Sequence, residues 1–268
     1  MPTHYPKTLP EAHRAFIDVA LRVLPEDSRI LGLAAAGSYL TDNMDEFSDL
    51  DLVVITEPGK QDEVLRDRVA IARELGTYLA GFTGEHVGEP RVLITLYGSP
   101  LIHVDLKFVS LADAHVRVEE PAVLWQRDER VSGALSQGRG VYPQPDIAWI
   151  DERFWIWMHY GALKIGRGEI FEAIDMINYV RSNVLGPLAL RRAGARPQGV
   201  RRLETAAPDF AAALRETVPS CTKADCLRAL HVSVDLYRQL RADYSNLKRH
   251  EGVEQEVLAY MQKIGIGM

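Results

Sequence analysis

The sequence has only two cysteines, no long apolar run and no excess of basic residues. Cys221 and Cys226 are too few for a disulfide framework or a four-ligand zinc site. No apolar stretch approaches the length of a transmembrane helix. The N-terminal MPTHYPKTLPEAHRAF also lacks the hydrophobic core of a signal peptide. We therefore expect a cytoplasmic protein with two reduced thiols.

The charge balance is acidic, with a formal net charge of −6 over 268 residues. This argues against a nucleic-acid polymer as the main partner, because proteins that bind one usually carry a basic surface. The hydrophobic share of 47% is ordinary for a globular protein. The length is sufficient for one large domain or two small ones, each with its own core.

Helix and strand patterns alternate in the first half of the chain, and strand patterns disappear after Pro143 and Pro145. The first half predicts helices over 10–25 and 61–80, strands over 30–37 and 50–55, and a hairpin from 91–98 and 101–109. The second half predicts helices over 154–166, 169–194, 222–247 and 253–264. We therefore expect an α+β protein with one domain over 1–145 and a helical bundle domain over 146–268.

The segment GSYLTDNMDEFSDLDLVV, at 37–54, places two acidic residues at the start of an apolar strand. Residues two apart in a strand share a face, so Asp49 and Asp51 point the same way. Two such charges about 4 Å apart repel by roughly 4 kcal/mol at an effective dielectric constant near 20. A divalent cation would offset that repulsion, and Mg²⁺ is the ion that prefers oxygen ligands and also binds phosphates.

A third carboxylate is predicted on a neighbouring strand. In LIHVDLKFV, at 101–109, His103, Asp105 and Lys107 alternate with an apolar face. If this strand lies beside 50–55, Asp105 joins Asp49 and Asp51. Three convergent carboxylates can hold two metal ions, the arrangement suited to phosphoryl or nucleotidyl transfer.

The Gly37–Ser38 pair follows the first buried strand. Glycine lets the backbone turn sharply and approach a ligand closely. Amide groups at the start of that turn can bind a phosphate, and the Ser38 hydroxyl adds a donor. A metal cluster beside a phosphate-binding turn supplies the positioning and charge stabilisation that phosphoryl transfer requires.

This combination resembles the nucleotidyltransferase superfamily of DNA polymerase beta. The superfamily pattern is a hydrophobic strand, Gly-Ser or Gly-Gly, and then D-x-D, which Gly37, Ser38, Asp49 and Asp51 match in order and spacing; Asp105 matches the third acid. The resemblance covers about 30–110 and implies a mixed sheet flanked by helices. The helical second half is similar, in architecture and size, to the bacterial aminoglycoside and lincosamide nucleotidyltransferases, whose activity is tied to antibiotic resistance.

The resemblance also implies roles for individual residues. Asp49 and Asp51 would coordinate two Mg²⁺ ions, and Asp105 would bind the catalytic ion and take the proton from an attacking hydroxyl. ATP would donate its nucleoside monophosphate and release pyrophosphate. We expect nucleotide contacts from Gly37, Ser38, Ser48, Lys107, Lys164 and Arg167, and acceptor contacts from Glu172, Asp175 and Asn178.

Plainer interpretations of these residues stay open. Asp49 could cap a turn, and Lys107 could be solvated. Lys164 and Arg167 could complement the dipole at the end of a helix. Glu172, Asp175 and Asn178, which share a helical face, could simply face water.

The predicted activity is transfer of a nucleotide to a hydroxyl of a small molecule, with an aminoglycoside- or lincosamide-like acceptor implied by the resemblance. A nucleotidyltransferase that modifies a protein or RNA is one alternative. A module that senses ATP without turnover is another. The sequence specifies neither the base of the nucleotide nor an oligomeric state.

Overall fold

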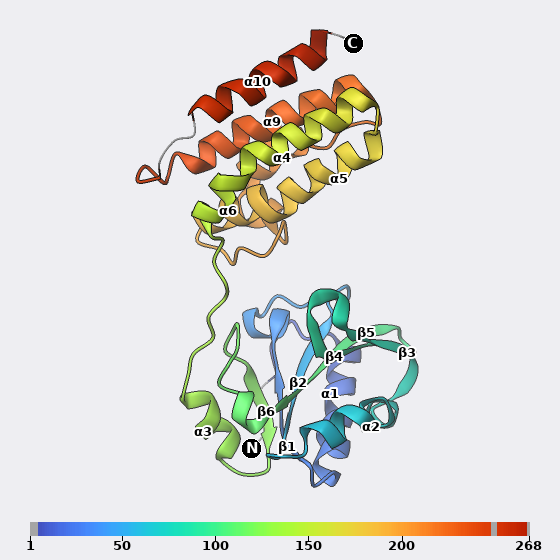
Figure 1. Ribbon diagram of the computed structural model, residues 1–268. Coiled ribbons are helices and arrows are strands. Elements are labelled where there is room, and N and C mark those ends of the chain that lie inside the picture. Colours follow the sequence, from blue (N-terminus) through green and yellow to red (C-terminus); the bar gives the residue numbers. More distant parts are fainter. Residues whose placement is uncertain (1–4, 248–250, 267–268) are drawn as a thin grey trace. The chain divides into compact units, whose positions relative to one another are not determined.

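The computed structural model describes residues 5–247 and 251–266. The chain divides into two compact units, one ending at Tyr142 and one beginning at Pro143 (Figure 1). The predicted boundary lies between residues 145 and 146. No helix in the described ranges is both long and apolar enough to cross a membrane.

The described part of the first unit, from residue 5, combines a sheet with three α-helices and short 3-10 turns. The α-helices are α1 (Glu11–Val23), α2 (Gln61–Glu74) and α3 (Arg130–Ser136). The strands are β1 (Ile30–Ala35), β2 (Leu50–Thr56), β3 (Thr77–Gly84), β4 (Glu89–Gly98), β5 (Ile102–Ser110) and β6 (Ala122–Gln126). The 3-10 turns are η1 (Leu24–Glu26), η2 (Gly37–Thr41), η3 (Glu85–Val87) and η4 (Leu111–Asp113).

The sheet is mixed, with the strand order β3-β4-β5-β2-β1-β6. Strands β2 and β5 are parallel, and the other neighbouring pairs of the described sheet are antiparallel. The predicted hairpin is the β4–β5 pair. The expected fold class, a mixed sheet flanked by helices and followed by a helical part, is confirmed.

Helices cover the two faces of the sheet unequally. On one face, α1 and α2 pack onto side chains such as Leu52 and Val54, with Ile17 and Val64 among the helical contacts. On the other face, Val131 of α3 packs against a smaller group that includes Leu31, Ala34, Ile55 and Val109. Because successive strand residues face opposite sides, Asp51 and Asp105 lie on the face that carries α3.

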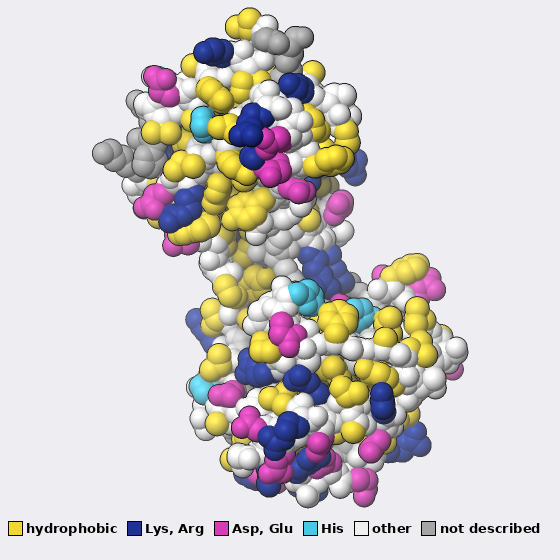
Figure 2. Space-filling model, turned by 45° about the vertical axis from the view of Figure 1, so that its right-hand side comes forward, with side chains coloured by type: hydrophobic (Ala, Val, Ile, Leu, Met, Phe, Trp, Pro, Cys, Tyr) yellow, Lys and Arg dark blue, Asp and Glu magenta, His cyan; other side chains and the backbone are white. Residues whose placement is uncertain are grey.

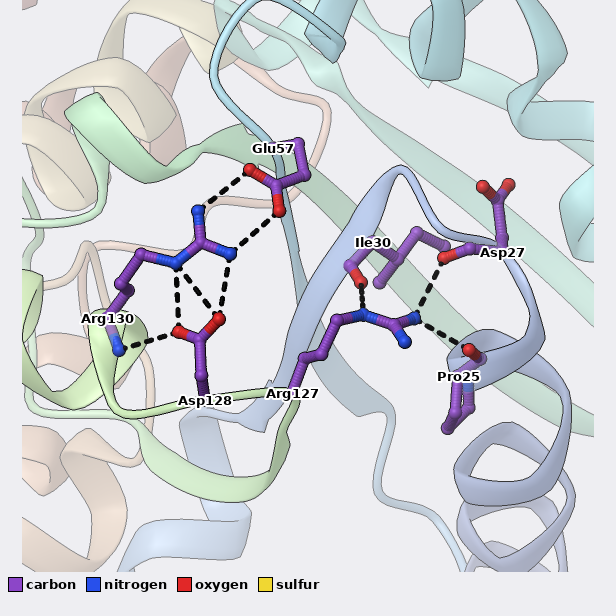
Figure 3. A network of polar contacts seen from close by, with 7 residues as sticks. All are labelled: Pro25, Asp27, Ile30, Glu57, Arg127, Asp128 and Arg130. Carbon is purple, nitrogen blue, oxygen red and sulfur yellow. Dashed lines mark hydrogen bonds and ion pairs between the residues drawn. The ribbon is translucent and has the colours of Figure 1, made fainter.

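Arginine side chains fasten the end of β6 to its neighbours (Figure 3). The Arg130 guanidinium forms two hydrogen bonds to the Glu57 carboxylate, at 2.8 and 2.9 Å, and also pairs with Asp128. Arg127 donates to the carbonyl oxygens of Ile30 and Pro25. These contacts hold β6 beside the start of β1 and the end of β2.

Three differences from the sequence prediction concern the first unit. The helix predicted over 61–80 ends at Glu74, and Tyr78 and Leu79 belong to β3. Tyr78 pairs with Tyr97 of β4, so pairing along the sheet edge overrides the helical pattern. Strand β6 and helix α3 were not predicted.

Within the described residues of the second unit, the regular elements are all helical, as expected. They are α4 (Ile147–Arg167), α5 (Ile170–Val180), α6 (Gly186–Arg192), α7 (Leu203–Ala206), α8 (Pro208–Arg215), α9 (Lys223–Arg241) and α10 (Glu251–Ile266). A π-helical turn, Arg181–Leu185, joins α5 to α6. Helices α4, α5, α9 and α10 pack side by side (Figure 1). Basic and acidic side chains are mixed on the visible face of each unit (Figure 2).

A buried carboxylate links α4 to α9. Asp151, only 3% exposed, accepts hydrogen bonds from the Tyr237 hydroxyl at 2.6 Å and from Arg241 at 2.5 and 2.9 Å. Phe154 stacks on the Tyr237 ring at 3.6 Å. Burial, and after it the bond to Asp151, raises the pKa of Tyr237, so this hydroxyl stays protonated.

We predict that Asp151→Ala lowers the free energy of unfolding by about 3–5 kcal/mol, because it leaves Arg241 without its buried counter-charge. Urea denaturation followed by circular dichroism measures the change. Asp243→Ala is the matched control, since Asp243 pairs with Arg192 at the surface and should change stability by about 1 kcal/mol or less. Equal effects of the two variants would contradict a structural role for Asp151.

Candidate functional site

The parallel β2–β5 pair brings two of the predicted carboxylates together. Asp51, the second residue of β2, and Asp105, the fourth residue of β5, are register partners. Asp49 lies one residue before β2 and is partly buried. The predicted adjacency of the two strands is therefore confirmed, and Asp105 lies directly beside Asp51.

The turn after β1 closes on the same place. The Ala36 amide donates to the Asp51 carbonyl oxygen at 2.9 Å, and Gly37 has a φ of +61°. A Cβ atom at position 37 would overlap a carboxylate oxygen of Asp51. Gly37 is therefore required twice, once for its left-handed conformation and once for the space that Asp51 occupies.

Ser38 presents a buried hydroxyl in this turn. Its Oγ atom is inaccessible to solvent and has no hydrogen-bond partner in the described parts of the chain. A buried hydroxyl without a partner is unfavourable and marks a place where a ligand or water would be stabilised. The prediction that Ser38 contacts the nucleotide fits this observation but is not tested by it.

The environment of Asp105 is unfavourable for a negative charge. Burial raises the pKa of this carboxyl, and the nearby charge of Asp49 raises it further. His103 acts in the opposite direction, with its Nε2 atom 2.9 Å from Asp105 Oδ1. The electrostatic effect of Asp49 on Asp105 shows that the two acids are close enough to interact. A cation between them would be stabilised for the same reason.

The chemistry of these groups fits Mg²⁺, although the ligand geometry is not assembled. Across residues 5–247 and 251–266, no three His, Cys, Asp or Glu side chains converge closely enough to hold a metal ion. Hard oxygen donors beside a glycine turn are nevertheless what a hard cation requires. Such a cation would also compensate the charge of Asp105, which burial disfavours. Asp49, Asp51 and Asp105 remain the residues that we expect to hold it.

Ser48 and His13 shape the chain just before Asp49. The Ser48 hydroxyl donates to Asp45 Oδ1 and accepts from the Asp45 amide, each at 3.0 Å, which closes a tight turn. The Nε2 atom of His13, a residue only 2% exposed on α1, lies 2.7 Å from the Ser48 carbonyl oxygen. A nucleotide contact from Ser48 stays a prediction. His13 was not predicted to lie near the site, although it shares the apolar helical face of Phe16 and Ile17.

Lys107 lies on the same strand face as Asp105 but is already paired. Its Nζ atom is 2.8 Å from Glu89 Oε2, and Glu89 also binds Arg91 at 2.6 Å. Hydrogen bonds from Arg91, and after it from Lys107, lower the pKa of Glu89 to about 2. A phosphate would have to compete with Glu89 for Lys107, and the predicted phosphate contact is untested.

The remaining predicted residues lie in the second unit. Lys164 pairs with Glu169 at 2.6 Å and with Glu172, and Arg167 pairs with Glu169 at 2.5 Å. These residues therefore form one ion-pair cluster where α4 meets α5. Along α5, Asp175 is exposed, and Asn178 accepts a hydrogen bond from Arg181 at 3.1 Å. The nucleotide and acceptor roles of these residues stay predictions.

A residue that the sequence did not indicate also reaches the turn. The Gly37 amide donates to Glu119 Oε1 at 3.0 Å. Glu119 lies in the irregular segment between β5 and β6, where the sequence EEP follows no strand or helix period. No sequence signal could have identified it, because the contact depends on how that segment folds back onto the sheet.

Comparison with known families agrees with the predicted class of the first unit. Residues 17–80 match the family model described as "Nucleotidyltransferase domain". The match includes Gly37, Ser38, Asp49 and Asp51, whereas Asp105 lies beyond it. Residues 17–80 of the first unit are therefore similar to a nucleotidyltransferase domain. No curated protein matches the chain.

Two solved structures show weak similarity over most of the chain. A nucleotidyltransferase-like protein from Exiguobacterium sibiricum is 14% identical with a TM-score of 0.40, covering 92% of this chain and 88% of that one. The STING-associated CdnE c-di-GMP synthase from Capnocytophaga granulosa is 13% identical with a TM-score of 0.33, covering 90% and 84%. With scores this low, neither structure indicates a substrate for this protein.

We predict that Gly37→Ala is much more damaging than Gly59→Ala. Both glycines have a positive φ, but a Cβ at Gly59 meets nothing within 4 Å. Gly59→Ala should lower the free energy of unfolding by about 1–2 kcal/mol through backbone strain alone. Gly37→Ala should lower it by about 1–3 kcal/mol more, because the methyl group displaces Asp51. Urea unfolding measures both, and equal losses would disprove the Gly37–Asp51 contact.

We also predict that Asp105→Asn stabilises the ligand-free protein at neutral pH. Folding raises the pKa of Asp105 above its ordinary value of 3.8. At a pH between 3.8 and the raised pKa, the folded chain therefore binds more protons than the unfolded chain. Stability therefore falls as pH rises through this window. The variant should melt about 2–4 °C higher at pH 7, with no gain below pH 3.8. Asp62→Asn, at an exposed helical position, is the control. A lower melting temperature at pH 7 would refute the prediction.

Proposed function

We propose that the protein is a Mg²⁺-dependent nucleotidyltransferase that transfers AMP from ATP to a hydroxyl group of a small molecule. The observation that carries the proposal is the Asp51–Asp105 register pair beside the Gly37 turn. Within the matched nucleotidyltransferase domain, this arrangement puts carboxylates and phosphate-binding donors at one place. A cytoplasmic location, where ATP is available, goes with this activity.

Each residue has a stated part in the proposed reaction. Asp49, Asp51 and Asp105 hold Mg²⁺, which when bound neutralises charge on the phosphates. The Gly37 amide and the Ser38 hydroxyl donate to phosphate oxygens, with Ser48 and Lys107 beside them. The acceptor oxygen bonds to the α-phosphorus, and the bond to the β-phosphate oxygen breaks and releases pyrophosphate. The acceptor proton passes to the Asp105 carboxylate, which acts as the general base.

We propose that the acceptor is a hydroxylated and cationic compound, such as an aminoglycoside- or lincosamide-like antibiotic. The acidic net charge supports a cationic acceptor. We assign acceptor contacts to Glu172, Asp175 and Asn178, which are exposed along one helix and carry oxygen acceptors for amines and hydroxyls. Lys164 and Arg167, which lie near the end of α4 and form ion pairs with Glu169, are assigned to phosphate.

We predict that Asp51→Asn reduces transfer by about 10²-fold or more while the fold is retained, because the substitution removes a metal-binding charge. The assay is pyrophosphate release from Mg²⁺ and ATP with a panel of aminoglycosides and lincosamides, and with protein and RNA in separate arms. EDTA should abolish release. Asp62→Asn, exposed on α2, is the matched control and should keep full activity.

The other outcomes of that assay identify the alternatives. Release only in the protein or RNA arm would replace the small-molecule acceptor. ATP binding without release in any arm would favour a sensing module. ATP binding that is indifferent to EDTA would contradict the metal-dependent proposal.

A further inference from the structure

Resting on the proposed function, we propose that the Glu119 carboxylate is an intramolecular competitor of the nucleotide at the Gly37 amide. Glu119 Oε1 accepts a hydrogen bond from this amide at 3.0 Å. A carboxylate and a phosphate both offer anionic oxygen to an N–H donor. The nucleotide must therefore replace Glu119 before its phosphate can use Gly37.

The Gly37–Ser38 turn resembles a phosphate cradle in which one donor is already engaged. Gly37 has the left-handed conformation that occurs in the concave backbone turns that bind anions. Next to it, the Ser38 hydroxyl is buried and without a hydrogen-bond partner in the described structure. Glu119 thus satisfies the amide and leaves the hydroxyl unsatisfied, whereas a phosphate has oxygens for both.

The position of Glu119 is imposed by its neighbours along the chain. The Arg117 guanidinium donates to the carbonyl oxygens of Leu135 and Gly138, each at 2.8 Å. Glu120 Oε1 accepts from the Gly140 amide at 2.5 Å. Gly140 also packs so closely on the Glu119 backbone that a Cβ atom there would overlap it. The backbone is therefore held in place, and the Glu119 side chain must rotate to release Gly37.

Two acidic side chains meet at Gly37. Glu119 and Asp51 both bring carboxylate oxygens to Gly37, one at the amide and one beside the α-carbon. Two like charges at one residue disfavour each other. A nucleotide that arrives with its metal ion brings positive charge to this place and takes over the amide. Glu119 would thus lower the affinity for the nucleotide with its metal ion, because its bond to the amide must be given up first.

Isothermal titration calorimetry with Mg²⁺ and the non-cleavable analogue α,β-methylene-ATP tests the competition. If Glu119 holds the amide in about nine of ten molecules, Glu119→Ala should bind the analogue about tenfold more tightly than the unmodified protein. Glu119→Gln should be intermediate, because a neutral amide oxygen still accepts from Gly37 but more weakly.

Glu120→Gln is the matched control. Its amide oxygen can still accept from Gly140, so its affinity should stay within about twofold of the unmodified protein. Thermal melts verify that each variant is folded. If Glu119→Ala does not melt cooperatively, the affinity of Glu119→Gln for the analogue is the test of competition. If the Glu119 variants bind the analogue no more tightly than the unmodified protein, competition is wrong and the proposed function stands.

Two further results would also overturn the competition. Weaker binding by the Glu119 variants only when Mg²⁺ is present would make Glu119 a metal ligand instead. If neither the unmodified protein nor the variants bind the analogue with Mg²⁺, the proposed function fails, and the competition fails with it.

Discussion

The parallel pairing of β2 with β5 is the constraint on which the candidate site depends. It makes Asp51 and Asp105 register partners, and Asp49 is close enough to disfavour ionisation of Asp105. A sheet tolerates such a pair only when something else supplies opposite charge or when one of the carboxyl groups keeps its proton. His103 supplies part of that compensation in the ligand-free chain, at 2.9 Å from Asp105. The remaining imbalance is the physical reason to expect a cation.

Much of the fold could be predicted from periodicity. The alternation in 101–109 and the short apolar run at 50–55 indicated two strands, and the hydrophobic faces of the second half indicated helices. The prediction was wrong at Tyr78 and Leu79, where a helical pattern continued past Glu74 but pairing with β4 prevailed. Strand β6, whose residues are all only partly buried, has too little apolar contrast to stand out.

The candidate site was predictable to the extent that its residues lie on regular elements. Asp51 and Asp105 follow from strand alternation, and the Gly37 turn follows from the end of a buried strand. Glu119 comes from an irregular segment and His13 from a distant helix. The contact of Glu119 with Gly37 and that of His13 with Ser48 therefore arise only through tertiary folding. Residues that support or occupy a site in this way carry no local signature in a single sequence.

The close approach of Gly37 to Asp51 has a consequence for how this sequence can diverge. A larger residue at 37 would require a smaller one at 51, because both side chains would fill the same space. A lineage that keeps the carboxylate must therefore keep the glycine. In a lineage that loses the carboxylate, the steric reason for glycine at position 37 disappears. Only the left-handed backbone conformation then still favours glycine. The two positions are thus linked in descent as well as in space.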